Sequence, residues 1–335
     1  MNEAPSGGPV FLFSAHRSGG TLLARALNCH PDLVIWGEHA GFINRLADID
    51  SIAGHYPRLT EPLADRDLAT FVAHEKSDPR VFDPWVTPFA QDGFRDWCRR
   101  YIETTFRHGL RPGQRWGFKE VRYHTVAVAG FLATLFPAAR FVILRRELYP
   151  LALSNLFAPW SVDRLRWTGA LLTEAGVRAA VTDCAYALAA IDHGFAAIAA
   201  ALPDRCHVVA YEAITPAATR LFAELFLFLG LRGSPELLQA IRAVVGARPG
   251  ASDARASEGH LTLHLVQRHL PEALAAPGFT PRPLCSTSVA RCMEPPRKAA
   301  HTMQARCSRS IPPPAPSSWC IRSPAAAMGR TRMRL

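Results

Sequence analysis

The chain has 335 residues, of which 49% are hydrophobic and 20% charged, so it is long and apolar enough to bury a sizeable core. It has no run of about 18 uninterrupted apolar residues and no basic residue near its start, so we expect a cytoplasmic protein without a membrane span. Ten basic residues and one acid lie in 281–335, which holds most of the net charge of +10, so the folded body is not expected to bind nucleic acid.

Short apolar segments alternate with helical patterns along most of the chain. A strand is predicted at 10–15, a helix at 21–28, and a mixture of helices and proline-rich loops over 40–110. Further strands are predicted at 114–121, 140–145 and 207–211, and further helices at 125–135, 151–157, 177–200 and 217–229. This alternation predicts an α/β fold with a parallel sheet flanked by helices on both faces.

The composition changes abruptly near residue 280. We therefore predict an α/β domain over 1–280 and a basic tail over 281–335, rich in proline, arginine and serine and without apolar periodicity. Such a tail cannot bury enough apolar surface to offset the entropy of ordering, so it is predicted to be disordered. The abrupt change in amino-acid composition also suggests out-of-frame translation, a hypothesis that an intact reading frame in the gene would discard.

The segment between the first strand and first helix, Ser14-Ala15-His16-Arg17-Ser18-Gly19-Gly20-Thr21, is typical of an anion-binding turn. Glycines allow close approach of the main chain, and the N–H groups of a helix N-terminus attract phosphate. The Walker loop places a lysine before its Ser or Thr, and this turn has none. Kinase-type transfer of a γ-phosphoryl group is therefore poorly supported, while an ordinary strand–turn–helix corner stays open as the simplest interpretation.

Two longer segments resemble the signatures of sulfotransferases that use 3′-phosphoadenosine 5′-phosphosulfate (PAPS), with similarity to bacterial carbohydrate and protein-tyrosine types. "RSGGTLLARALNCHPDLVIWGEH" looks like their 5′-phosphosulfate loop, and "FVILRRELYPLALSNLF" looks like their second signature. "WGFKEVRY" and "YEAITPAATRLFAELFLFLGL" are similar to later landmarks, so the resemblance spans roughly 9–232. It implies a P-loop-NTPase-like fold. The donor-binding residues that it implies are Arg17, Ser18, Gly19, Gly20, Thr21, Leu22, Arg146 and Ser154.

The chemistry of sulfuryl transfer indicates two further residues. Negative charge gathers on the departing phosphate oxygen, so cations such as Arg17 and Lys119 would stabilise it without a metal ion. The acceptor must lose a proton, and Glu38 is our candidate for the base because related enzymes carry a glutamate in a comparable position. A structural salt bridge at Glu38, a role for the adjacent His39 as base, and a solvated Lys119 remain alternatives.

Other residues near these motifs have two interpretations each. Arg122 is predicted either to hold an anionic ligand or to pair with Glu120, and Tyr211-Glu212 to close a strand and order nearby loops. Trp36, Trp116 and Trp160 could stack on a ligand or pack in the core. The turn after Arg146 departs from the family's Arg-Asp-Pro, because Pro150 comes late, and this puts the reach of Ser154 in question.

The sequence therefore predicts a PAPS-dependent sulfotransferase acting on a hydroxyl, less favourably an amine, of a small-molecule, carbohydrate or peptide acceptor. We expect 40–110 and the helices of 160–200 to line the acceptor pocket. A catalytically silent nucleotide-binding protein and an atypical P-loop kinase are the alternatives. The eight cysteines form no Cys-x-x-Cys pair, and no metal site is predicted.

Overall fold

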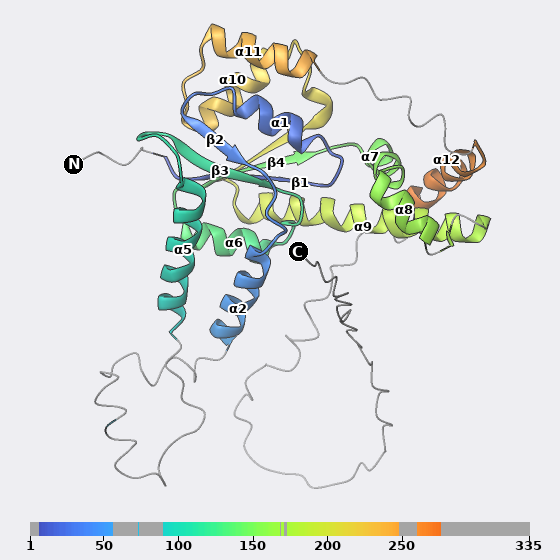
Figure 1. Ribbon diagram of the computed structural model, residues 1–335, viewed down its shortest axis with the longest axis horizontal. Coiled ribbons are helices and arrows are strands. Elements are labelled where there is room, and N and C mark those ends of the chain that lie inside the picture. The colour runs from blue at the N-terminus through green and yellow to red at the C-terminus, as the bar shows by residue number, and fades with distance from the viewer. Residues whose placement is uncertain are drawn as a thin grey trace, which may run out of the picture. The chain divides into compact units, whose positions relative to one another are not determined.

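A computed structural model describes residues 7–55, 73, 90–167, 169–170, 173–247 and 260–275 (Figure 1). Its strands are β1 (Val10–Ser14), β2 (Leu33–Trp36), β3 (Arg115–Glu120), β4 (Arg140–Arg145) and β5 (Cys206–Ala210). Its helices are α1 (Gly20–Leu27), α2 (Ile43–His55), α5 (Gln91–Arg107), α6 (Val126–Leu135), α7 (Leu148–Leu156), α8 (Pro159–Trp167), α9 (Glu174–Ala201), η3 (Tyr211–Ala213), α10 (Thr219–Phe228), α11 (Pro235–Gly246) and α12 (His260–Ala275). The predicted tail at 281–335 lies outside the described residues.

The five described strands form one sheet, all parallel, in the order β2-β3-β1-β4-β5. In register, Phe13 of β1 lies opposite Glu120 of β3, and Ser14 lies opposite Leu144 of β4. Because parallel strands end at the same edge, the loops after all five strands meet there. The predicted α/β fold with a parallel sheet is confirmed.

Helices cover both faces of the sheet, and each face has its own apolar core. On one face, α1, α10 and α11 pack over alternate strand residues such as Leu12 and Val142 (Figure 1). On the other, α5, α6 and α9 pack over the intervening residues, including Phe11 and Phe141. This alternation is what a strand buried on both sides requires, and it fixes the direction of every side chain near the strand ends.

The longest described helix, α9, runs along the second face. By length and a mean hydropathy of 1.4 it is the one described helix long and apolar enough to cross a membrane. In this structure it packs against β4, β5, α6, α7 and α12, with Val181 and Ile198 fully buried. Thr173 caps its N-terminus by accepting a hydrogen bond from the N–H of Gly176.

Two boundaries differ from the predictions in ways that matter for function. β2 was not predicted, because its four residues are only half buried and stand between two turns. α7 begins at Leu148, three residues before the predicted start. Pro150 therefore falls in the first turn of α7, where a missing N–H costs nothing, and the helix continues regularly to Ser154.

Candidate active site

The turn between β1 and α1 forms a tight cradle. Gly19 has φ +96° and stands at the N-cap of α1, where the first N–H groups of a helix point out of its end. A Cβ at Gly19 would collide with the ring of Tyr211, and a Cβ at Gly20 would collide with the hydroxyl of Ser14. The main chain therefore approaches its surroundings more closely than any other residue type allows, as an anion-binding turn requires.

Ser18 stabilises this turn from within. It is fully buried, and its hydroxyl donates to the carbonyl of Ala15 at 2.7 Å. The backbone N–H of Leu22 donates to the carbonyl of Gly19 at 2.9 Å, and the Leu22 side chain packs on the core beneath α1. Both residues were predicted to bind the donor. In the structure they form hydrogen bonds within the turn and so stabilise its conformation.

A second group of cations stands beside the turn. Arg146, just after β4, donates to the carbonyl of Arg17 at 2.8 Å, and its guanidinium lies 4.3 Å from the ring centre of Tyr211. The buried Nε of Arg146 has no hydrogen-bond partner among the described residues. Arg17 in turn donates from Nε to the hydroxyl of Ser154 at 3.4 Å. Two guanidinium groups and one hydroxyl thus converge on a site suited to a phosphate.

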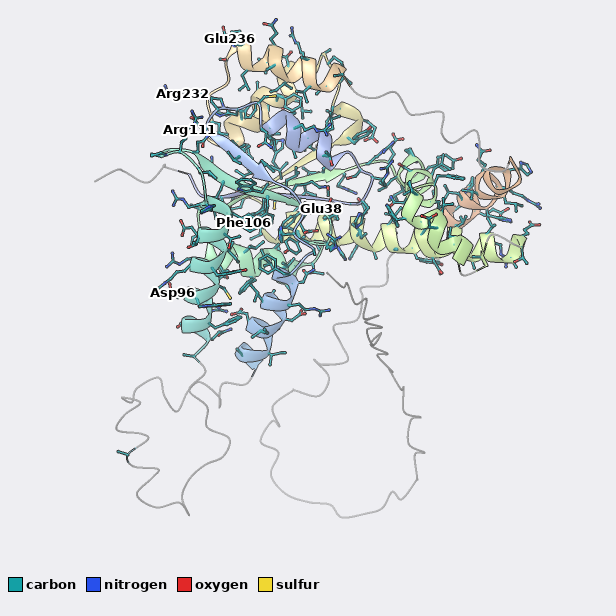
Figure 2. All side chains as sticks on the ribbon, in the orientation of Figure 1. Glu38, Asp96, Phe106, Arg111, Arg232 and Glu236 are labelled. Carbon is teal, nitrogen blue, oxygen red and sulfur yellow. The ribbon has the colours of Figure 1, made fainter. Side chains whose placement is uncertain are left out.

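Glu38 and Lys119 meet across the mouth of the turn. Lys119 is 8% exposed near the end of β3, and its ammonium donates to Oε1 of Glu38. Arg122 approaches the other carboxylate oxygen at 3.4 Å. Figure 2 shows Glu38 at the opposite end of the sheet from Arg111, which precedes β3. The unpredicted strand β2 explains this position, because its end delivers Glu38 to the same edge as Lys119.

Glu120 holds the loop that carries Glu38, a role that the sequence analysis missed. Its carboxylate is fully buried and accepts backbone N–H groups from His39 and Gly41, both at 3.0 Å. It also accepts from the N–H of Val121 at 2.9 Å and from the N–H and guanidinium of Arg122 at 3.3 and 2.7 Å. Burial alone would raise the pKa of Glu120, but the hydrogen bonds led by that of the His39 N–H hold this pKa below its ordinary value.

The backbone of that loop explains why such a clamp is needed. Ala40 and Gly41 both have positive φ, at +60° and +69°, which reverses the chain between β2 and α2. A non-glycine residue in this conformation is strained, so Ala40 needs support from its neighbours. The bonds to Glu120 on either side of Ala40 supply it. The Glu120 carboxylate thereby fixes the backbone that carries Glu38, and with it the direction of the Glu38 side chain.

His39 points away from Glu38. Its Nε2 lies 2.7 Å from the hydroxyl of Tyr123, which also accepts the N–H of Ile43 at 3.0 Å. Its ring packs against Phe106 and Phe118, and burial lowers its pKa. The structure therefore places Glu38 at the cavity and His39 in an aromatic core beneath it. The alternative of His39 as base finds no support in this geometry.

These residues enclose one cavity of about 620 Å³ at the edge of the sheet. It is lined by Ser14, Ala15, His16, Arg17, Gly19, Gly20, Thr21, Glu38, Lys119, Val121, Arg146, Ser154 and Tyr211. Eight of the ten predicted site residues lie on its wall, and Ser18 and Leu22 do not. Ser14, His16 and Tyr211 also line the cavity and were not among the predicted site residues, although Ser14 and His16 belong to the predicted anion-binding turn.

The remaining residues considered from the sequence have definite positions. Arg122 pairs with Glu120 and with Glu38, so one of its two interpretations is realised here. Glu212 accepts the N–H of Glu147 at 3.1 Å and braces the turn after β4, as expected for a residue that orders nearby loops. Trp116 is 4% exposed and packs in the core, whereas Trp160 is 52% exposed beside His16.

Comparison with known proteins places these motifs in context. A family model described as the sulfotransferase family matches residues 9–235. Among solved structures, a sulfotransferase domain from the curacin biosynthetic pathway is 18% identical, with 71% of this chain and 78% of that chain covered and a TM-score of 0.43. Sulfotransferase STF9 from Mycobacterium avium is 17% identical, with coverage of 81% and 77% and a TM-score of 0.42.

A third solved structure, a retinol dehydratase in complex with androsterone and the inactive cofactor PAP, is 13% identical. The match covers 82% of this chain and 82% of that one, with a TM-score of 0.33. No curated protein matches the sequence. The family match spans every residue of the cavity wall.

Proposed function

This chain belongs to the sulfotransferase family, and from that premise we propose that it transfers a sulfuryl group from PAPS to a hydroxyl group of an acceptor. The observation that carries the proposal is the Glu38–Lys119 pair, which faces the glycine turn across one cavity. Displacement at sulfur needs a base for the acceptor and a cation for the leaving group, and this pair supplies one of each at the edge of the cavity that the turn forms.

The residues present fit such a donor substrate. The close approach of the main chain at Gly19 and Gly20 leaves N–H groups and a helix N-terminus for the 5′-phosphosulfate. The unpaired Nε of Arg146, together with Arg17 and Ser154, offers donors for a 3′-phosphate. Both anion sites open into the same cavity, as a ligand with phosphate groups at both positions requires.

In the proposed reaction, the acceptor oxygen forms a bond to sulfur while the bond from sulfur to the 5′-phosphate oxygen breaks. Glu38 takes the proton of the acceptor hydroxyl. Lys119 and the N–H groups of the turn stabilise the charge that develops on the departing phosphate oxygen. PAPS supplies the activated sulfuryl group and leaves as the bisphosphate PAP.

The ion pair between Lys119 and Glu38 implies an order of events. The ammonium of Lys119 occupies one carboxylate oxygen of Glu38, so that oxygen becomes free to accept the acceptor's proton only when Lys119 turns to the donor. Arg122 stays in contact with Glu38 and maintains its orientation. We therefore propose that the donor binds before proton transfer becomes possible.

The test is titration calorimetry with PAP, followed by turnover of PAPS over an acceptor panel, on the wild type and Glu38→Gln. We expect Glu38→Gln to bind PAP as tightly as the wild type, or more tightly, because one negative charge is removed beside the phosphate site. We expect kcat to fall about 10²- to 10⁴-fold, the typical contribution of a general base. Exposed Glu224→Gln is the matched control.

Two results separate the parts of this proposal. A wild-type protein that does not bind PAP contradicts the donor assignment altogether. A Glu38→Gln variant that retains the wild-type kcat contradicts the assignment of Glu38 as base and leaves the donor assignment standing.

A further inference from the structure

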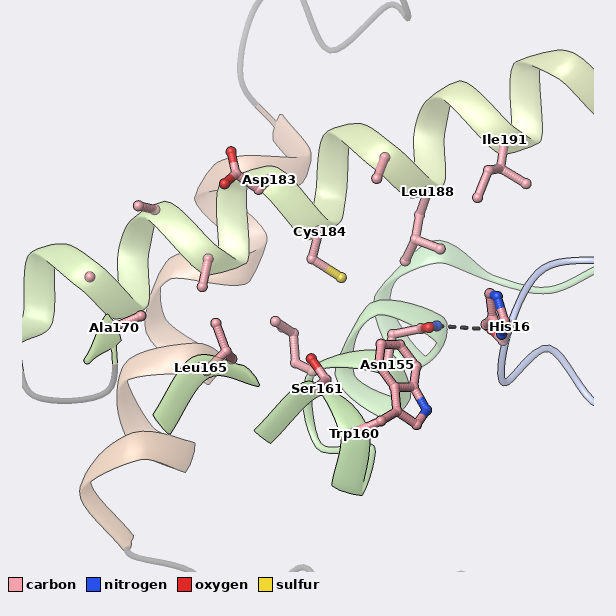
Figure 3. Close-up of a pocket in the computed structure, with 15 residues that line it drawn as sticks. His16, Asn155, Trp160, Ser161, Leu165, Ala170, Asp183, Cys184, Leu188 and Ile191 are labelled. Carbon is pink, nitrogen blue, oxygen red and sulfur yellow. Dashed lines mark hydrogen bonds between the residues drawn. The ribbon is translucent and has the colours of Figure 1, made fainter. Parts of the chain in front are cut away.

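A second cavity of about 620 Å³ lies beside the first, between α9 on one side and α7 and α8 on the other (Figure 3). Its α9 wall consists of residues three and four positions apart along one face: Gly176, Ala179, Ala180, Asp183, Cys184, Ala187, Leu188 and Ile191. Most of these side chains are small, which leaves open space between α9 and the opposite wall. Leu156, Trp160 and Leu165 form the facing wall.

The two cavities share one residue, His16. The His16 ring lies 5.8 Å from that of Trp160, and its carbonyl accepts a hydrogen bond from Asn155 at 2.9 Å, drawn in Figure 3. Burial lowers the pKa of His16, and the nearby charges of Glu38 and Lys119 also act on it. His16 thus stands between the reacting groups of the first cavity and the apolar wall of the second.

The chemistry of the second cavity differs from that of the first. No lysine or arginine lines it among the described residues, and its walls are mainly alanine, leucine and isoleucine. Besides His16, its polar side chains are few: Ser161 and Asn155 are buried, and Asp183 is exposed. Such a cavity favours an uncharged apolar body and offers no counter-charge to an anionic one.

The cavity is also elongated. From Gly176 to Ile191 its wall follows α9 for about 22 Å, at about 1.5 Å per residue. His16 and Ile191 lie at one end in Figure 3, and Ala170 lies at the other. A long and narrow molecule fills such a space better than a compact polycyclic one.

We propose that this second cavity binds the acceptor, and that the acceptor is a long, uncharged aliphatic alcohol whose hydroxyl reaches Glu38 past His16. The inference rests on the proposed sulfuryl transfer and names its acceptor class. The aliphatic chain lies along the α9 wall, and the hydroxyl enters the first cavity at the junction. Glu38 then takes the hydroxyl proton as the acceptor oxygen bonds to sulfur.

The experiment measures PAPS-dependent turnover of primary alkanols from hexanol to dodecanol, with N-acetylglucosamine and a tyrosine amide as polar acceptors. Each methylene that enters the cavity should raise kcat/KM about four-fold. Ala187→Phe fills the wall near His16 and should lower kcat/KM for every alkanol at least ten-fold. Ala179→Phe fills the far end, so it should affect dodecanol and leave hexanol unchanged.

Controls separate this inference from the proposed function. Ala196→Phe lies on the same helix, is exposed and does not line the cavity, so it should behave as the wild type. PAP titration should give the same Kd for all variants. In PAP-loaded protein, decanol should raise the Tm, and Ala187→Phe should abolish that shift.

Three outcomes decide the matter. Turnover of the polar acceptors alone, unaffected by Ala187→Phe, overturns the cavity assignment while the sulfotransferase function stands. Binding of PAP without alkanol turnover and without a decanol-dependent Tm shift also overturns it. Absence of PAP binding in the wild type contradicts the proposed function itself.

Discussion

The buried carboxylate of Glu120 offers the sharpest test of how this fold positions Glu38, the proposed base. Glu120→Gln preserves the size of the side chain and replaces one carboxylate oxygen with an NH₂ group. On one side that group would face the N–H donors of His39 and Gly41; on the other, those of Val121 and Arg122. At least two hydrogen bonds are therefore lost whichever way the amide turns.

The expected magnitude follows from those bonds. A hydrogen bond to a charged group contributes about 1.5–3 kcal/mol, so two bonds correspond to about 3–6 kcal/mol. The released N–H groups belong to a loop that can move toward water, so we expect the lower value, about 3 kcal/mol, in the free energy of unfolding. Glu38 leaves from the same loop, and a displacement of about 1 Å should lower kcat about 100-fold.

The assay combines three measurements on Glu120→Gln, with Glu224→Gln as control. Urea unfolding reports stability, PAP titration reports the donor site, and PAPS turnover reports kcat. Because Arg17 and Arg146 are held by other strands, the Kd for PAP should stay within about two-fold. The exposed Glu224 forms a surface ion pair with Arg220, so its variant should change stability by about 1 kcal/mol or less. Wild-type kcat in a folded Glu120→Gln protein would refute the positioning role.

The pH dependence of stability gives a second prediction. The pKa of Glu120 is lowered from 4.5, so its contribution to the free energy of unfolding is present above pH 4.5 and is lost as the pH falls through the folded-state pKa. In urea unfolding, acid should therefore lower the stability of Glu120→Gln less than that of the wild type. Equal losses of stability would contradict the role of Glu120 in holding the loop. The third prediction concerns Arg146→Lys. A lysine cannot stack on Tyr211 while donating to the Arg17 carbonyl, so the Kd for PAP measured by calorimetry should rise at least ten-fold. An unchanged Kd would exclude Arg146 from the phosphate site.

Much of the fold could be predicted because its central strands are buried on both sides. β4 has four fully buried apolar residues in a row, and its predicted limits agree with the structure. β2 was missed for the opposite reason: among the described strands it pairs with β3 alone, and Trp36 at its end is 40% exposed. A four-residue edge strand has too little periodicity to stand out from the loops around it.

The sequence indicated which charged residues gather at this cavity better than it indicated the residues that hold them in place. Arg17, Lys119 and Arg146 follow or end strands, and the topology of a parallel sheet brings such residues together. The sequence did not indicate the role of Glu120, because a glutamate next to a lysine is usually an exposed surface residue and only the structure shows that this one is fully buried. The inward position of His16 likewise depends on Asn155 and Trp160, which are more than 135 residues away in sequence.

The absence of a lysine from the glycine turn has a structural explanation. Lys119 comes to the turn from β3, and its Cε would lie 3.3 Å from a Cβ at position 20. Glycine at position 20 therefore leaves room for a cation that a different strand supplies. Because Lys119 comes from β3, its ammonium also contacts Glu38 directly. In the proposed reaction, this contact joins the cation assigned to the leaving group to the carboxylate assigned as base, and it suits a displacement in which both must act at once.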